Sequence, residues 1–212
     1  MGKKEDLYMN DDITIKVFHA SDRETRVEDI KFPGPRNDCD FGQGFYLTEN
    51  KQVANEWVCN AYTPIINEYK FSFNKKDALY LENTEWLKVV LGFRKEAYKV
   101  NFKSNIIHGL IANDRMVDVI PLFISGIIGD KRLIECLDFC KFGNQYCLKN
   151  SAEGLEFIKS APLKGLELQQ ARDRYYTRRS DMTNQLRIIQ RNSIPGEKYI
   201  EDYLSEGDYN EV

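Results

Sequence analysis

The order of apolar and polar residues along the chain predicts several short strands. Ile13–His19 alternates, with Ile13, Ile15 and Val17 on one face, which is typical of a half-buried strand. Further strands are expected at Phe45–Thr48, Tyr69–Phe73, Ala78–Leu81, Ile106–Ala112 and Gln145–Leu148. The first of these is entered through two glycines, Gly42 and Gly44.

Apolar residues that recur every three or four positions predict the helices. We expect one helix capped by Asn50 and a second capped by Thr84. Others are expected after a cap at Asp114, bent or shortened at Pro121, and at Asp130–Cys140 and Ser151–Lys159. The polar, proline-containing segment Ser21–Asp38 is predicted to be a long loop.

Strands and helices follow one another without a repeating β-α-β order. The glycines form G-x-G but neither G-x-G-x-x-G nor G-x-x-x-x-G-K-[ST], so the sequence supports neither a Rossmann dinucleotide site nor a P-loop. We therefore expect an α+β fold rather than a doubly wound α/β fold.

The C-terminal part differs in composition from the rest. Six apolar residues between Leu168 and Ile189 fall on one stripe of a helix, and six arginines against two aspartates in residues 171–191 give a net charge of +4. Residues 197–212 then carry a net charge of −5. We divide the chain into a main domain, 1–160, and a basic amphipathic helix with an acidic tail, 161–212. Either the stripe packs on the main domain while the arginines face water, or the helix is a docking surface.

Composition and charge narrow the class of protein. The chain of 212 residues is 42% hydrophobic and 30% charged, as in ordinary globular proteins, and its net charge of −3 does not indicate a nucleic-acid binder. No apolar run approaches the roughly 20 residues of a membrane span, and no apolar signal segment follows the N-terminus. We expect a cytoplasmic protein without a membrane partner; delivery into another cell stays open. Five cysteines without a C-x-x-C and two histidines predict buried free thiols and no metal site.

Three short segments carry candidate chemistry. His19 ends a strand in V-F-H-A-S, Tyr46 lies in D-F-G-Q-G-F-Y-L-T ahead of a helix with Trp57, and Gln145 opens the strand N-Q-Y-C-L-K. Each has a structural alternative, because His19, Tyr46 and Trp57 could be core residues and Gln145 a strand-edge residue. Together, a histidine, two aromatic rings and a polar strand start could frame a flat aromatic ligand.

In this order and spacing the segments resemble the ADP-ribosyltransferase superfamily, and most closely the bacterial DUF3990 family. The resemblance covers about Val17–Lys159 and includes F-P-G-P-R, K-Q-V-A-N-E-W and I-A-N-D-R. The glycine segment also looks like that of the poly(ADP-ribose) polymerase branch, whose catalytic trio is histidine, tyrosine and glutamate. The resemblance implies a split β-sheet with flanking helices that binds NAD⁺ as a co-substrate, without a metal.

The resemblance also implies roles for single residues. His19 would hydrogen-bond the adenosine-side ribose, the main chain of Ala20 would hold the carboxamide, and Arg36 would lie near the phosphates. Tyr46 and Trp57 would stack on nicotinamide. The implied catalytic residues are His19, Tyr46 and Gln145, and the implied NAD-binding residues are His19, Ala20, Ser21, Arg36, Gly44, Phe45, Tyr46 and Trp57. We expect the catalytic three to converge on one cleft, which Trp57 also faces.

Gln145 departs from the superfamily pattern, which has a catalytic glutamate at this position. A glutamine keeps the hydrogen bond to the nicotinamide ribose but supplies no charge, which argues against poly-ADP-ribose chain growth. A glutamate at position 145 is expected to hold or raise NAD⁺ cleavage. Glu49, Glu56 and Asp118 are candidates for supplying the charge from elsewhere.

The function implied by the resemblance is mono-ADP-ribosyl transfer, a pentosyltransferase reaction that releases nicotinamide. The expected protein is a bacterial toxin or effector that modifies a macromolecule, a protein rather than a nucleic acid, with an antitoxin or regulator docking on the 168–189 helix. Three alternatives stay open: an NAD⁺ glycohydrolase, a catalytically degenerate module that binds NAD⁺, ADP-ribose or a partner, and an interaction protein built on that helix.

Overall fold

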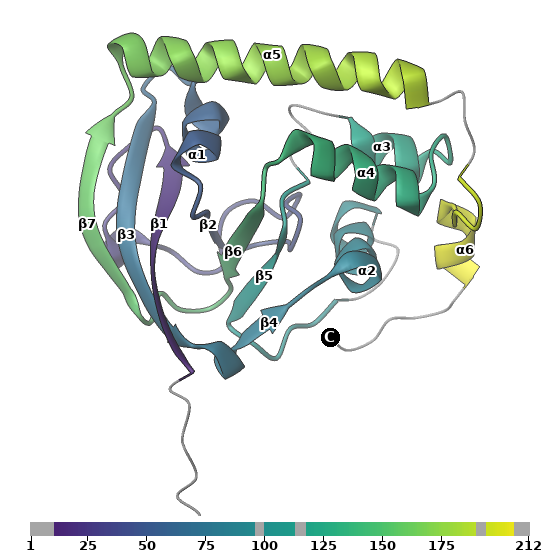
Figure 1. Cartoon of the computed structure of the whole chain (residues 1–212). Coiled ribbons are helices and arrows are strands. Elements are labelled where there is room, and N and C mark those ends of the chain that lie inside the picture. The colour runs from purple at the N-terminus through teal and green to yellow at the C-terminus, as the bar shows by residue number, and fades with distance from the viewer. Residues whose placement is uncertain (1–10, 96–99, 113–117, 190–193, 206–212) are drawn as a thin grey trace, which may run out of the picture.

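Two β-sheets and the helices around them form an α+β fold (Figure 1). The structure is a computed structural model that describes residues 11–95, 100–112, 118–189 and 194–205. Its strands are β1 (Asp12–Ser21), β2 (Phe45–Leu47), β3 (Ile65–Asn74), β4 (Ala78–Tyr80), β5 (Ile106–Leu110), β6 (Asn144–Leu148) and β7 (Leu155–Pro162). Its α-helices are α1 (Lys51–Val58), α2 (Asn83–Lys95), α3 (Val119–Ile124), α4 (Asp130–Cys140), α5 (Gly165–Ile189) and α6 (Ile200–Ser205).

A main-chain bridge joins the two sheets. β1, β3 and β7 form an antiparallel sheet with β3 in the middle, and the second sheet has the order β2-β6-β5-β4, with β4 and β5 parallel. Phe18 of β1 and Thr48, just after β2, exchange two main-chain hydrogen bonds of 2.8 and 3.0 Å. This bridge places the end of β1 beside β2.

The four-stranded sheet has an apolar core on each face. Phe45, Leu47 and Tyr146 pack toward the three-stranded sheet, against residues such as Tyr69 and Phe71. The other face is covered by α2, α3 and α4, whose buried residues join Ile107 and Cys147 of the sheet. Because side chains alternate along a strand, neighbours on β2 and β6 point into different cores.

Most of the predicted elements are present. The Asn50 side chain caps α1 by accepting hydrogen bonds from the amides of Gln52 and Val53, at 3.0 and 3.3 Å. α4 spans the predicted Asp130–Cys140. Thr84 is not a cap, because α2 already begins at Asn83. The predicted cap Asp114 lies outside the described residues, and α3 is short, with Pro121 in its first turn.

The helix predicted over Ser151–Lys159 is wrong, because this segment leads into strand β7. Gly154 has a φ of +78°, which interrupts a helix, and a Cβ there would lie 2.0 Å from the carbonyl oxygen of Ser72. After it, Leu155 and Phe157 pack against β3 with the two-residue period of a strand. The apolar alternation of Leu155 and Phe157 covers only two positions, which does not distinguish a strand from a helix in the sequence.

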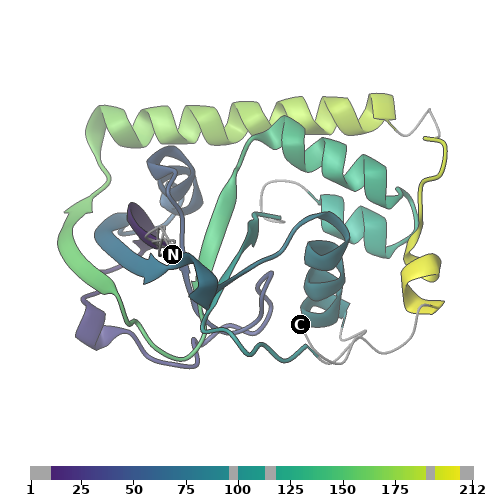
Figure 2. The ribbon, with the colours of Figure 1, turned by 60° about the horizontal axis from the view of Figure 1, so that its bottom comes forward.

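Helix α5 lies across α1 and α4 (Figures 1 and 2). Ala171 and Met182 of its predicted stripe are buried, and Leu168 and Tyr175 pack beside them. The interpretation in which the arginines only face water is wrong for three of them. Arg172 Nε donates to the Cys59 carbonyl at 3.0 Å, and Arg174 and Arg178 lie 3.4 and 3.1 Å from the Glu56 carboxylate, whose side chain is fully buried.

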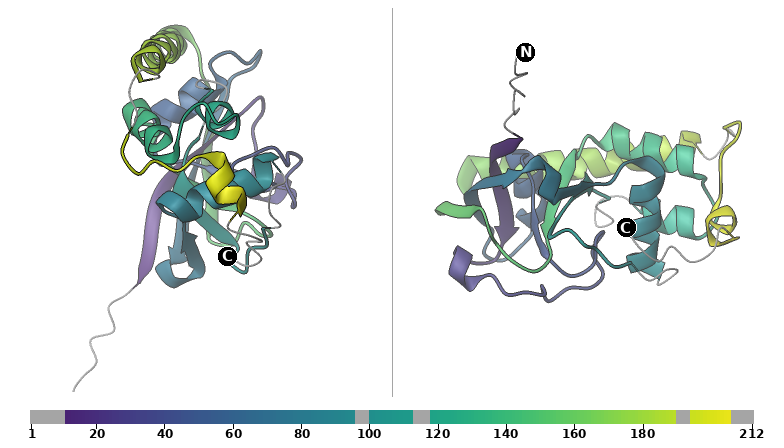
Figure 3. Two further views of the ribbon diagram at one scale, coloured as in Figure 1. Left: turned by 90° about the vertical axis from the view of Figure 1, so that its right-hand side faces the viewer. Right: turned by 90° about the horizontal axis from the view of Figure 1, so that it is seen from below.

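Helix α6 lies at the opposite end of the molecule from β7 (Figure 3). Its Tyr203 hydroxyl donates to Asp130 at 2.8 Å, and the Tyr203 ring packs edge-on against Phe123 of α3. The described part of the acidic segment is therefore anchored on α3 and α4. None of the helices in the described part of the chain is long and apolar enough to cross a bilayer.

Candidate active site around Gln145

Tyr46 and Gln145 lie on the same face of the four-stranded sheet. Tyr46 pairs with Cys147 across β2 and β6, and Gln145 is two residues before Cys147, so their side chains share a face. This is the face covered by α2, α3 and α4. Both side chains reach one segment, residues 40–44, which we call the glycine loop.

The Gln145 side chain is held with its oxygen unused. The residue is 3% exposed, and Nε2 donates to Asp40 Oδ2 at 2.7 Å and to the Leu110 carbonyl at 3.1 Å. Both partners are oxygens that accept, so the amide orientation follows from the chemistry of its neighbours. Among the described residues no donor bonds Oε1, and that atom remains available to accept a hydrogen bond.

Asp40 accepts hydrogen bonds from three groups, one of which is Gln145. It is 6% exposed and accepts hydrogen bonds from Gln145, from Arg94 Nη2 at 2.6 Å and from the Ala112 amide at 3.0 Å. A buried carboxylate requires such donors, because burying an unpaired charge is costly. The sequence pattern indicates no role for Asp40 or Arg94. The available signal was an acidic residue at the start of a glycine segment, and nothing in the sequence showed what it would contact.

Tyr46 ties the glycine loop to β2. Its hydroxyl donates to the Gly42 carbonyl at 2.6 Å and accepts from the Phe41 amide at 3.0 Å. Burial raises the pKa of Tyr46 well above its usual value, so the hydroxyl stays protonated. The Phe41 ring lies nearly parallel to the Tyr46 ring, with centroids 6.3 Å apart. The hydroxyl is thus used by the loop, and only the half-buried ring could serve a ligand.

His19 lies on the other side of β2. Its ring stacks on Phe45 at 4.3 Å, and its Nδ1 is 2.9 Å from the Tyr46 carbonyl oxygen. Because Phe45 and Tyr46 alternate along the strand, the structure does not place His19, Tyr46 and Gln145 on one face as expected. Burial lowers the pKa of His19, which favours the neutral ring. A carbonyl can only accept, so Nδ1 carries the proton and Nε2 is an acceptor.

Trp57 lies on the same side as Tyr46. It is half-buried on α1 and packs against the cluster that Tyr46 also contacts. Gly44, just before β2, packs closely on β6, because a Cβ there would lie 2.3 Å from Cys147 Sγ. Trp57 and Gly44 are therefore near the Gln145 side of the sheet.

The other predicted NAD-binding residues are Ala20, Ser21 and Arg36, which lie at the end of β1 and in the segment that follows it. Ala20 and Ser21 end β1, where the Ser21 hydroxyl donates to the Arg23 carbonyl at 2.6 Å. Arg36 is half-exposed and makes two hydrogen bonds of 3.1 Å to Asp38. Its guanidinium is bound within the loop rather than directed at Gln145.

None of the three carboxylates predicted to supply charge contacts Gln145. Glu49 accepts a hydrogen bond from the Tyr146 hydroxyl at 3.2 Å, and Glu56 is paired with α5. Asp118 precedes α3 and is exposed. The carboxylate that does contact Gln145 is Asp40. In the described part of the chain, no three His, Cys, Asp or Glu side chains gather as a metal site would require.

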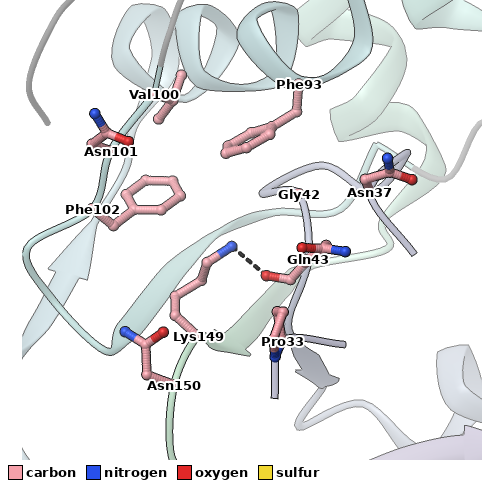
Figure 4. A pocket seen from close by; sticks show the side chains of 10 residues that line it. All are labelled: Pro33, Asn37, Gly42, Gln43, Phe93, Val100, Asn101, Phe102, Lys149 and Asn150. Carbon is pink, nitrogen blue, oxygen red and sulfur yellow. Dashed lines mark hydrogen bonds between the residues drawn. The ribbon is translucent and has the colours of Figure 1, made fainter. Parts of the chain in front are cut away.

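A pocket of about 310 Å³ opens beside the glycine loop (Figure 4). Its lining includes Gly42, Gln43 and Lys149, together with the rings of Phe93 and Phe102, but not His19, Tyr46 or Gln145. Lys149 Nζ donates to the carbonyls of Phe41 and Gln43 and lies over both rings, 5.4 and 5.2 Å from their centroids. Burial lowers the pKa of Lys149. Lys149 therefore anchors the glycine loop through two of its carbonyl groups.

The fold and the Asp40–Gln145 pair define an α+β protein with a buried polar site under a glycine-containing loop. The pattern of the family described as protein of unknown function (DUF3990) matches residues 15–159, and the chain belongs to this family. The match includes His19, Asp40, Tyr46 and Gln145 and ends before α5. Comparison with curated proteins and comparison with solved structures found no match.

Proposed function

We propose that this protein is an NAD⁺-dependent mono-ADP-ribosyltransferase with its site at Gln145. The observation that carries the proposal is the orientation of the Gln145 amide, which spends both N–H groups on Asp40 and Leu110 and leaves Oε1 as an acceptor. The proposed reaction needs an acceptor at this position for a hydroxyl of the nicotinamide ribose. Two sheets joined at one bridge beside β2 are consistent with the split sheet implied by the resemblance.

In the proposed reaction, the bond between ribose C1′ and the nicotinamide nitrogen breaks, and its electron pair leaves with nicotinamide. A nucleophilic group of the acceptor then bonds C1′ and loses its proton. Gln145 Oε1 holds the ribose by accepting a hydrogen bond, which fixes C1′ relative to the acceptor. His19 Nε2 is proposed to accept a hydrogen bond from the adenosine-side ribose, across β2 from Gln145.

We propose that the molecule that accepts ADP-ribose is a protein. We also propose that this chain acts as a toxin or effector. The net charge of −3 gives the chain no overall attraction for nucleic acid. The exposed side of α5, which carries Tyr176 and Arg179, is the proposed place for a regulator.

The experiment that tests the proposed function measures nicotinamide release from NAD⁺ by the purified full chain, with and without a cell extract. Labelled NAD⁺ reports transfer of ADP-ribose to protein in the same reactions. Release that depends on the extract, with labelled protein, is the expected result. Release to water alone would identify a glycohydrolase, and binding without release would contradict both enzyme assignments.

Two observations favour a second candidate, an NAD⁺- or ADP-ribose-binding module without catalysis. Gln145 is only 3% exposed, and the Tyr46 hydroxyl is already bonded to the glycine loop. A site this closed could hold a ligand at its edge without acting on it. Calorimetric binding of NAD⁺ by a protein that releases no nicotinamide is the result that this candidate requires.

Trp57→Ala should weaken NAD⁺ binding by about 1–3 kcal/mol if the indole stacks on nicotinamide, by analogy with base stacking on aromatic side chains. The measurement is NAD⁺ titration at equal folded concentration. Phe123→Leu, at a fully buried position of α3, is the matched control. It should lower the melting temperature and leave the affinity unchanged; if Trp57→Ala behaves in the same way, Trp57 is a core residue only.

A further inference from the structure

The surroundings of Gln145 are unsuited to the glutamate that the wider superfamily carries. Nε2 lies 2.7 Å from a carboxylate oxygen of Asp40 and 3.1 Å from the Leu110 carbonyl oxygen. A carboxylate at position 145 would place its own acceptor oxygens next to the Asp40 carboxylate and the Leu110 carbonyl, and no hydrogen would lie between them. Only an amide, which donates on one side and accepts on the other, satisfies these two oxygens and keeps an acceptor for a ligand.

We propose that Asp40 is a positioning residue that fixes the Gln145 amide from the glycine loop by accepting the hydrogen bond of its Nε2. The inference rests on the proposed function for its catalytic part. Asp40 acts through Gln145 and does not touch substrate, because both of its carboxylate oxygens already accept hydrogen bonds from Arg94, Ala112 and Gln145. Its hydrogen bond polarises the amide and makes Oε1 a stronger acceptor.

Two further contacts fix the Asp40 carboxylate, and a third holds its loop. Arg94 of α2 binds one oxygen at 2.6 Å, and the Ala112 amide binds the other at 3.0 Å. The loop that carries Asp40 is held by the Tyr46 hydroxyl. The carboxylate is therefore preorganised, and the Gln145 oxygen needs no rearrangement before it binds a ligand hydroxyl.

The inference reverses the expectation that a glutamate at 145 would hold or raise activity. In Gln145→Glu two carboxylates would face one another and share a proton, because both cannot ionise at this distance. The folded variant would hold a proton that its unfolded chain releases. Its stability would therefore be greatest at low pH and would fall as the pH rises.

Other titratable and charged groups around Asp40 do not produce this pH dependence. In the described part of the chain they are Arg94 on α2, Arg36, Asp38 and Cys39 just before the glycine loop, Tyr46 on β2, Cys147 on β6 and Lys149 just after β6. Burial raises the pKa of Cys39 and of Tyr46, and that of Cys147 to about 12. An arginine stays charged throughout. These groups are the same in wild type and in Gln145→Glu, so a difference in pH dependence between the two would come from the added carboxylate.

The test compares Gln145→Glu, Asp40→Asn and the double variant Asp40→Asn/Gln145→Glu. The first readout is the melting temperature at pH 5 and pH 8, which needs no NAD⁺. Gln145→Glu should lose more stability at pH 8 than at pH 5, and the double variant should lose this difference because it again holds one carboxylate. Glu156→Gln, which removes an exposed carboxylate on β7, is the control and should show no change in pH dependence. Equal pH dependence of wild type and Gln145→Glu would overturn the inference.

The second readout is nicotinamide release. Asp40→Asn should lower kcat roughly 10–100-fold, less than the roughly 10²–10³-fold that loss of a directly contacting group costs, with little change in the KM for NAD⁺. The double variant should be more active than Gln145→Glu. If Asp40→Asn does not fold, the comparison of Gln145→Glu with the double variant carries the test, because the two differ only in whether a second carboxylate is present.

Failure of this inference differs from failure of the proposed function. Unchanged kcat in Asp40→Asn, with activity lost in Gln145→Ala, overturns the role of Asp40 and leaves the transferase in place. No release by the wild type overturns the function and the catalytic part of the inference together. The melting-temperature series then decides by itself whether Asp40 dictates an amide at position 145.

Discussion

Replacing Gln145 by alanine should lower nicotinamide release by a factor of about 10²–10³, the cost of removing one positioned hydrogen-bonding group from a transition-state site. The variant loses Gln145 Oε1, the amide oxygen that Asp40 and Leu110 leave unused. Asp40 keeps its bonds from Arg94 and Ala112, so the glycine loop should stay in place. The loss should therefore fall on kcat rather than on folding.

The measurement is release at saturating NAD⁺ and equal folded concentration, with melting temperatures recorded in parallel. Asn144→Ala is the matched control, because it removes an exposed amide side chain from the preceding position of β6. It should keep wild-type turnover. Equal rates for wild type and Gln145→Ala would show that Gln145 is a structural strand residue and would remove the central residue of the proposed mechanism.

The double variant Arg174→Ala/Arg178→Ala should lower the free energy of unfolding by about 3–5 kcal/mol, the range for leaving a buried charge without its partner. Glu56 is fully buried and is paired with both arginines. Glu56→Gln should cost less, because the two arginines are 32% and 21% exposed and can still reach water. The order of the two losses is the specific expectation, since counting broken contacts would make them equal.

Urea unfolding followed by circular dichroism checks this second prediction. For a chain of this size the larger loss corresponds to a fall in melting temperature of roughly 6–20 °C. Arg179→Ala, on the exposed side of α5, is the control and should stay near wild type. A double variant no less stable than Arg179→Ala would mean that α5 is held by its apolar stripe alone.

Local structure follows from the sequence where it depends only on residues a few positions away. The Asn50 cap needs only the amides two and three residues ahead, and the limits of α4 follow from its own spacing. The helix predicted at Ser151–Lys159 failed because β7 is a strand only through its pairing with β3. Pairing partners 86 residues apart, such as Lys70 and Glu156, leave no trace in a short window of sequence.

The candidate site was predicted only in part for the same reason. Motifs singled out Tyr46 and Gln145, which the structure does bring to one face. Asp40 and Gln145 are 105 residues apart, and their hydrogen bond depends on how the glycine loop folds over β6. The position of His19 depends on where two sheets join, which alternation within either strand does not encode.

The Glu56 ion pairs also predict how relatives of this protein should vary. Glu56 lies inside the range matched by the family, whereas Arg174 and Arg178 lie beyond its end at residue 159. In a relative without a helix like α5, a glutamate at this position would be exposed to water or buried without a charged partner. Chain length and residue identity at this position should therefore change together across the family, with a neutral side chain in the shorter members.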